Sequence, residues 1–324
     1  MKNFGLFFNQ TLGPMGFDLV NGRQTYAGPY NPDTGWPIQL PWQDPKPNTL
    51  FVVHFPDFVT VRDGRVLELE KVEQFYKQYC HQVLVTHWTD NLDKIYQGPL
   101  NLVKFSNHNY DMANMLAEHF DSWQHIHSAP KTHAWQCLNG RICPHRRSVA
   151  YKMKELGNGW LSLGTEIPLP QHDYSCLFGC ENLPNFTSLS YVYQSAPINI
   201  VTETQYDPPV GIITEKTQMA IAAQQIPIVI GYRGIVAHCR RMGFDMFDDV
   251  VDTSYDDLPN EHRWSAALER NWHLFQQPVD LEPYRQRLER NMRRLLWGLP
   301  ESMETAFVAQ ARALADRLLP GYTP

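Results

Sequence analysis

Short apolar runs alternate with amphipathic stretches along most of the chain. The runs Leu50–Phe55, Gln82–Val85 and Leu100–Phe105 have the length and composition of buried strands. Apolar residues recur every three or four positions from Leu69 to Tyr79, and Met112–Phe120 follows the same pattern, which indicates helices. Strands and helices in alternation predict a parallel sheet covered by helices.

A second alternating series begins near His133. Short apolar runs predict strands at Ala134–Leu138, Trp160–Leu163, Ile198–Thr202, Ile226–Ile230 and Phe247–Val251. Apolar residues at helical spacing predict helices at Arg146–Leu156, Thr214–Gln225 and Ile235–Met242. This order is that of a second Rossmann-like unit, so the simplest architecture is two such units in tandem.

The end of the chain has a helical pattern. Apolar residues step by three and four from Leu281 to Leu295, and again from Met303 to Leu318. We therefore expect an α/β protein with two Rossmann-like domains facing a cleft and with C-terminal helices. The domains are expected at residues 1–132 and 133–300, with residues 301–324 packing back onto the first domain.

Composition excludes several classes of protein. Of the 324 residues, 43% are hydrophobic, which excludes a disordered or fibrous chain. The formal net charge of −6 excludes a globally basic coat for nucleic acid, although it leaves room for a local basic patch. An aromatic share of 12% with a charged share of only 19% suits clefts that bind polar, ring-shaped ligands.

The apolar runs are too short for a membrane span or a secretion signal. Ile226–Ile230 has the length of a strand, whereas a membrane span needs about 18–20 residues. The six cysteines fit no zinc pattern or disulfide framework, and the four histidines between His119 and His133 lack a pair at helical spacing. We therefore expect a cytoplasmic protein that needs no membrane, metal or cofactor.

The segment Gly211–Thr217, with the sequence GIITEKT, carries candidate chemistry at the start of a predicted helix. Thr214 is the expected N-cap, and Glu215 and Lys216 occupy the first turn. A helix N-terminus favours phosphate because its amides are unpaired and its dipole is positive there, and Lys216 adds a full charge. The Glu215 carboxylate can accept hydrogen bonds from two neighbouring hydroxyls, such as those of a ribose. The alternative interpretation is an ordinary capped first turn.

A second basic position lies at the start of the helix predicted over Arg146–Leu156. Arg146 belongs to the stretch CLNGRICPHRRSVAYKMKEL, which begins at Cys137. An arginine at a helix N-terminus is a fork-shaped donor that can pair with a diphosphate. The alternative is a solvated basic turn.

Together these motifs resemble the α1,3-fucosyltransferase family of fucosyltransferase-like glycosyltransferases, and a related group found in phages and large viruses. The resemblance rests on TEK followed by a small-residue helix and IPIVIG, then on RRMGF at Arg240–Phe244 and DTSYD at Asp252–Asp256. It covers roughly residues 133–260. The sequence departs from the fucosyltransferases at Ile212, where they carry a tyrosine, so the sugar is left open.

The resemblance implies a GT-B type glycosyltransferase that binds a nucleotide sugar as co-substrate in its second domain. Asn139 and Arg146 match the family pattern of a strand, an asparagine, a short loop and a phosphate-binding arginine. With Arg146, Lys216 would hold the diphosphate and Glu215 the ribose. The remaining candidates for the donor site are Thr214, which caps the helix, and Glu203 and Tyr255, which shape the sugar pocket.

An inverting transfer also needs a general base in the first domain. Asp57 and Asp90 are the candidates because each follows a predicted strand, and His54 and His87 are substitutes. Each of these residues is equally consistent with an ordinary loop position.

The acceptor is open between two classes. One is a glycan or small saccharide, and the other is a hydroxymethylated base of phage DNA, which would place the protein in the host cytoplasm. The arginines between Arg285 and Arg294 either contact a phosphate backbone or form a solvated face paired with Glu282 and Glu289. A non-catalytic nucleotide-sugar-binding protein of the same fold is the alternative to an enzyme.

Overall fold

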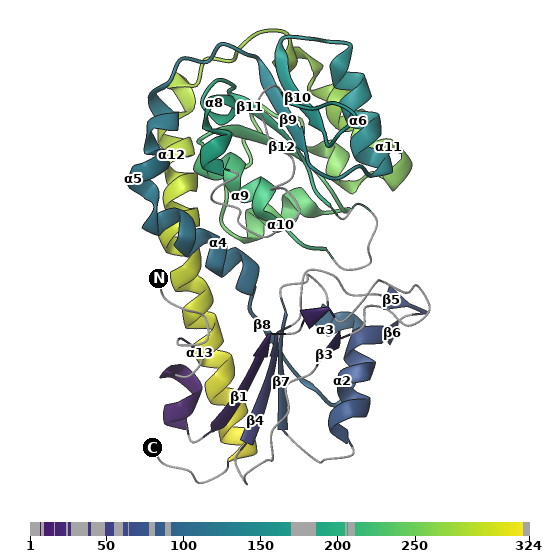
Figure 1. Ribbon diagram of the computed structural model, residues 1–324, viewed down its shortest axis with the longest axis vertical. Coiled ribbons are helices and arrows are strands. Elements are labelled where there is room, and N and C mark those ends of the chain that lie inside the picture. Colours follow the sequence, from purple (N-terminus) through teal and green to yellow (C-terminus); the bar gives the residue numbers. More distant parts are fainter. Residues whose placement is uncertain are drawn as a thin grey trace. The chain divides into compact units, whose positions relative to one another are not determined.

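A computed structural model describes residues 7, 10–15, 17–23, 25–26, 38–39, 49–54, 61–63, 65–77, 82–87, 92–169, 186–204, 206 and 211–319. Contacts divide the chain into two compact units (Figure 1). Unit 1 comprises residues 1–111 and 301–324, and unit 2 comprises residues 112–300. The domain borders expected near 132 and 300 stay a prediction.

Unit 1 contains a parallel sheet with the strand order β1-β4-β7-β8. Its strands are β1 (Asp18–Arg23), β4 (Thr49–His54), β7 (Gln82–His87) and β8 (Asn101–Lys104). The other elements are η1 (Gly13–Met15), α2 (Leu67–Lys77), α3 (Leu92–Ile95) and two antiparallel strand pairs, β2 (Thr25–Tyr26) with β3 (Ile38–Gln39) and β5 (Val61–Arg62) with β6 (Arg65–Val66).

The core of unit 1 joins the sheet to the last helix of the chain. Leu50, Val52 and Leu84 of the strands pack in one cluster with Phe307 and Leu314. The two latter residues belong to α13 (Leu299–Leu318), and they fall on its predicted apolar stripe. Residues near the two ends of the sequence therefore share one core.

Unit 2 contains the second parallel sheet, in the order β10-β9-β11-β12. Its strands are β9 (Trp135–Asn139), β10 (Gly159–Leu163), β11 (Ile198–Thr202) and β12 (Ile226–Ile230). Every residue of β11 and β12 is buried. β12 is accordingly a continuous apolar run, and the two polar residues of β11, Asn199 and Thr202, donate hydrogen bonds to Gln225 and Asn139. Pro227 is accommodated because β12 is an edge strand of the described sheet, where a missing N–H breaks no ladder.

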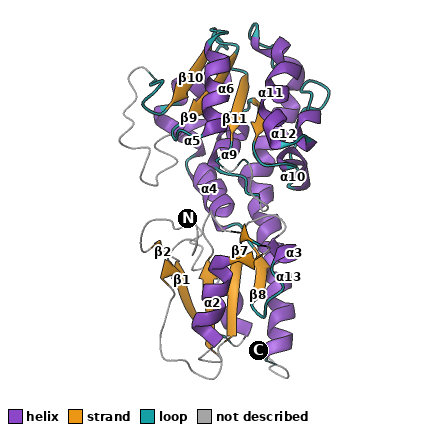
Figure 2. Ribbon diagram, turned by 90° about the vertical axis from the view of Figure 1, so that its right-hand side faces the viewer, coloured by secondary structure: helices purple, strands orange, loops and turns teal. Residues whose placement is uncertain are grey.

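Helices cover both faces of this second sheet. α6 (Pro144–Lys154) and α11 (Asn260–Arg270) pack together on one side, and α9 (Glu215–Ala222) and α12 (Arg285–Arg293) on the other (Figure 2). Smaller elements complete unit 2: α5 (Phe120–Trp123), η2 (Gln124–Ser128), α8 (Ser190–Tyr193), α10 (Ile235–Arg241), η4 (Ser254–Asp257), η5 (Trp272–Phe275), η6 (Glu282–Tyr284) and η7 (Arg294–Gly298). The chain passes between the units in α4 (Asn107–Glu118) and at the start of α13.

The expected α/β class, with parallel sheets and C-terminal helices, is confirmed. The strand predicted at Phe247–Val251 is wrong, because this stretch is a turn in which Phe247 has φ +58°. The amides of Val250 and Val251 both donate to the Phe247 carbonyl, each at 2.8 Å. No helix in the described part of the chain combines the length and the hydropathy needed to cross a membrane.

Candidate functional site at the carboxyl edge of the second sheet

The second sheet has a topological switch point between β9 and β11. β10 follows β9 in the chain and lies on one side of it, and the next strand, β11, lies on the other side. The connections that leave the carboxyl ends of β9 and β11 therefore diverge, and open α/β sheets bind ligands at such points. α6 follows β9 and α9 follows β11, so both helices begin at this edge.

Asn139, the last residue of β9, ties three strand ends together. It is fully buried, and its backbone N–H donates to Ser162 Oγ of β10 at 3.0 Å. Its side-chain Oδ1 accepts from the hydroxyl of Thr202, the last residue of β11. Its Nδ2 contacts Cys137 Sγ at 3.3 Å. The structure thus places Asn139 beneath the edge, as a link between strands.

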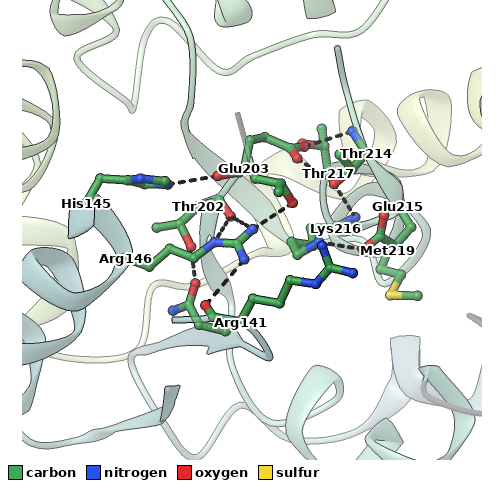
Figure 3. A network of polar contacts seen from close by, with 12 residues as sticks. Arg141, His145, Arg146, Thr202, Glu203, Thr214, Glu215, Lys216, Thr217 and Met219 are labelled. Carbon is green, nitrogen blue, oxygen red and sulfur yellow. Dashed lines mark hydrogen bonds and ion pairs between the residues drawn. The ribbon is translucent and has the colours of Figure 1, made fainter. Parts of the chain in front are cut away.

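Arg146 lies in the first turn of α6 and is 1% exposed. Its Nε and Nη2 donate to the Thr202 carbonyl at 3.2 and 2.9 Å, and Nη2 also donates to Thr204 Oγ1 at 3.0 Å. Nη1 donates to the Arg141 carbonyl at 3.4 Å. Burial lowers the pKa of Arg146. The guanidinium therefore clamps the loop after β9 to the end of β11 (Figure 3), and its predicted contact with phosphate stays a prediction.

Glu203 follows β11 directly and is fully buried. Its carboxylate accepts from the amide of Thr214 at 3.1 Å, from Thr217 Oγ1 at 2.6 Å and from the Thr214 hydroxyl. These three donors belong to the start of α9, so Glu203 fixes that start against the end of β11 (Figure 3). The predicted role of Glu203 in a sugar pocket stays a prediction.

Thr214 caps α9 as its position in the sequence predicts. It has extended backbone geometry, and its Oγ1 accepts from the Lys216 amide at 3.5 Å. Glu215 and Lys216 form an ion pair with each other, and each side chain keeps 23% of its surface exposed. An accessible acid and base therefore lie side by side at the positive end of α9, and Glu203 holds the N-cap residue of this helix in place.

His145, next to Arg146, anchors the same edge from the other side. It is 7% exposed, and its Nε2 donates to the Glu203 carbonyl at 2.9 Å. Its ring stacks on Tyr206, with centroids 4.5 Å apart and planes 8° from parallel. Burial lowers the pKa of His145 to about 4, so the imidazole is neutral at physiological pH.

Comparisons with known proteins leave the family open. No protein-family profile matches the sequence, and no curated protein matches it. A crystal structure of an α1,3-fucosyltransferase aligns with 73% of this chain and 68% of its own, at 10% identity and a TM-score of 0.31. A TM-score of this size does not establish a shared fold. The candidate site is therefore described by its own geometry.

Other sequence candidates have different surroundings. Tyr255 is fully buried, and its hydroxyl donates to the Val229 carbonyl of β12 at 3.0 Å. Asp57 and Asp90, the candidate general bases, lie outside the described residues. Of their substitutes, His87 is 2% exposed at the end of β7.

No cluster of three or more potential metal ligands occurs among the residues that the structure describes. The histidines between His119 and His133 make other contacts. His127 Nε2 donates to the Ala222 carbonyl at 2.8 Å, and His133 Nδ1 lies 3.0 Å from Thr132 Oγ1.

Sequence reasoning missed the supporting residues of this edge. Thr204 and Tyr206 belong to no motif, and Thr217 ends the GIITEKT segment without a predicted role, because the roles of all three depend on partners brought close only by the fold. His145 gave one usable signal, its place beside Arg146 at a predicted helix start. Arg141 gave a similar signal, since it is an exposed basic residue in the loop between a predicted strand and a predicted helix.

Proposed function

We propose that unit 2 binds a nucleoside-diphosphate sugar at the carboxyl edge of its sheet, and that the protein is a glycosyltransferase. The observation that carries the proposal is the partly exposed Glu215–Lys216 pair at the capped start of α9, beside the switch point between β9 and β11. Phosphate is favoured there by the helix dipole and by the Lys216 ammonium. Glu215 provides a carboxylate for the ribose hydroxyls.

The other residues of the edge support this pair. Glu203 holds the first turn of α9, and Arg146 and Asn139 hold the ends of β9 and β11. Preorganised donors around a leaving diphosphate lower the barrier because they need no rearrangement during the reaction. We therefore propose that Lys216, the amides of α9 and, where it reaches the ligand, Arg146 stabilise the diphosphate without a metal.

The transfer itself is a displacement at the anomeric carbon. A general base takes the proton from the acceptor hydroxyl, whose oxygen forms the new bond to that carbon. The bond from the carbon to the diphosphate oxygen breaks, and the nucleoside diphosphate leaves with the electron pair. A GT-B arrangement of two Rossmann-like domains, with Asp57 or Asp90 as the base, belongs to this proposal.

A glycan or small saccharide is the acceptor class that we propose. Hydroxymethylated DNA has no specific support, because four of the five arginines between Arg285 and Arg294 are bonded within unit 2. Arg287 pairs with Asp245 at 2.6 Å and with Asp249 at 2.8 Å. Arg285 and Arg293 pair with glutamates and Arg294 donates to the Met242 carbonyl, so that of the five arginines only Arg290 has no side-chain hydrogen bond or ion pair among the described residues. A steep salt dependence of duplex binding would favour DNA instead.

Calorimetric titration with UDP and GDP, followed by their sugars, tests the donor site. We expect one nucleoside diphosphate to bind, and Lys216→Met to weaken it about tenfold to a hundredfold, since a bond to a charged group contributes about 1.5–3 kcal/mol. Lys152→Met is the matched control, because Lys152 also pairs with a glutamate, Glu155, on a helix of unit 2. Equal losses in both variants would refute the assignment.

Turnover separates the enzyme from a binding protein of the same fold. We expect the chain to release nucleoside diphosphate from the sugar donor that binds, by transfer to an acceptor or to water. Binding without any release over a panel of saccharide acceptors would favour the non-catalytic alternative.

A further inference from the structure

Unit 2 contains a cavity of about 510 Å³ that plays no part in the proposed transfer. Its wall is formed by three segments: residues 127–131 at the end of η2 and just after it, residues 223–224 just after α9, and residues 280–289 before and within η6 and α12. We call it the Lys131 cavity. A volume of this size lies within the range of small-molecule sites, about 300–1,000 Å³.

The ammonium of Lys131 lacks a counter-charge in this cavity. Its Nζ donates to the Gln194 carbonyl at 2.8 Å, which leaves two of its three N–H donors for other partners. No carboxylate among the described residues forms an ion pair with Lys131. Burial lowers the pKa of Lys131 to about 8, so the group is still mostly cationic at pH 7. A cation removed from water is normally paired, and here the cavity offers the place for an anion.

The other charged groups of the wall are mostly satisfied. Glu282 pairs with Arg285 at 2.6 Å, and Glu289 pairs with Arg293 at 2.8 Å. Asp280 is the exception in the described wall, since its Oδ1 accepts only the Glu282 amide, at 3.0 Å, and no cation pairs with it. The cavity therefore offers one cation without a counter-charge and one carboxylate that can accept further hydrogen bonds.

His127 adds a second acceptor. Because Nε2 donates to the Ala222 carbonyl and burial lowers the pKa of the ring, the imidazole is neutral and its Nδ1 carries a lone pair. Ser128 and Gln224 add a hydroxyl and an amide to the same wall. Acceptors and neutral polar groups around one cation without a counter-charge suit a ligand that carries one anionic group and several hydroxyls.

We propose that the Lys131 cavity is a second binding site, for a small phosphorylated polyol such as a sugar phosphate. The phosphate binds the Lys131 ammonium, and the hydroxyls donate to Asp280 and His127. This site is separate from the proposed donor site, because residues 223–224 lie at the opposite end of α9 from Glu215 and Lys216. A helix of eight residues spans roughly 12 Å.

Thermal-shift and calorimetric titrations of the full chain with glucose 6-phosphate test the proposal. We expect glucose 6-phosphate to bind, inorganic phosphate to bind at least tenfold more weakly, and Lys131→Met to weaken glucose 6-phosphate at least tenfold. Lys154→Met, at an exposed lysine of α6, and Lys216→Met should leave this binding unchanged. The proposal would be overturned if Lys131→Met bound glucose 6-phosphate as tightly as the unaltered protein, or if Lys216→Met lost this binding. Binding of glycine in place of the sugar phosphate would also overturn it.

Chemical labelling of the unaltered protein keeps the test independent of variant stability. Acetic anhydride acylates lysines in their neutral form, and mass spectrometry measures the rate at each site. We expect glucose 6-phosphate to slow the acylation of Lys131 severalfold and to leave that of Lys154 unchanged. Equal rates at Lys131 with and without the ligand would exclude the site.

Discussion

Replacing Arg146 with methionine removes a buried cation and its hydrogen bonds from the edge of the second sheet. The guanidinium uses four of its five N–H donors on the Thr202 and Arg141 carbonyls and on Thr204. Methionine has a similar length and no donor. The two carbonyls and the hydroxyl would then be left without these partners at the point where α6 and α9 begin.

The expected loss of stability follows from these contacts. Hydrogen bonds to a charged group contribute about 1.5–3 kcal/mol each, and an unsatisfied buried acceptor costs about 1–3 kcal/mol. Against these losses, methionine avoids the desolvation of a cation, which amounts to several kcal/mol in an interior. We expect a net loss of about 3 kcal/mol, within the range for a broken buried polar network. For a domain of this size that lowers Tm by about 6–12 °C.

Urea unfolding and differential scanning calorimetry of Arg146→Met measure this loss. Arg147→Met is the matched control, because Arg147 is the next residue of α6 but is exposed and pairs only with Glu166 at the surface. The control should have the same urea midpoint and Tm as the unaltered protein. If Arg146→Met were as stable as the unaltered protein but had lost nucleotide binding, Arg146 would be a ligand-binding residue and not a clamp.

Three further changes test the same edge. The free energy of unfolding should fall as the pH drops from about 6.5 to about 4, because the folded protein keeps His145 neutral whereas the unfolded chain binds a proton there. In urea titrations at several pH values, His145→Gln should flatten this slope. His262→Gln, at an exposed site, should leave it unchanged. Thr214→Val should cost about 1 kcal/mol in unfolding free energy through loss of the cap, and Thr214→Ser should restore most of it. Glu215→Gln should weaken binding of a nucleoside diphosphate more than that of inorganic diphosphate in calorimetry, since its proposed partner is the ribose; equal weakening of both would exclude that contact.

The parts of unit 2 that the sequence predicts well are those set by local interactions. β12 is an apolar run and β11 a mostly apolar one, both fully buried, and the start of α9 is fixed by a threonine followed by a helix-forming stretch. Each of these signals is complete within about ten residues. The periodicity of the chain was therefore sufficient to predict the alternation of strands and helices.

The role of Arg146 was not predictable in this way. Its partners Thr202 and Thr204 lie 56 and 58 positions further along the chain, so the sequence shows only a cation at the start of a helix. Glu203 is similar, since its carboxylate meets α9 only after an intervening loop. Polar residues whose partners are distant in sequence can be identified as candidates, but the fold decides whether they face a ligand or the interior.

The turn at Phe247 shows the opposite failure. The run FDDVV has strand-like apolar residues at both ends, which led to the wrong prediction. Asp245 Oδ1 accepts from the Phe247 amide at 2.9 Å, a local turn contact, and Arg287 holds the same carboxylate. A side chain that bonds to the nearby backbone competes with strand pairing.

The division of unit 1 into residues 1–111 and 301–324 has a consequence for synthesis on the ribosome. All four strands of the second sheet, the last of which ends at Ile230, are synthesised long before Phe307, Ala311 and Leu314, which unit 1 needs for its core, have been added. The second sheet can therefore reach its folded state while the first still waits for its last helix. A premature stop near residue 300 would keep every residue of unit 2 but remove Phe307, Ala311 and Leu314, which cover the apolar face of the unit 1 sheet, and we expect chaperones to bind that exposed face.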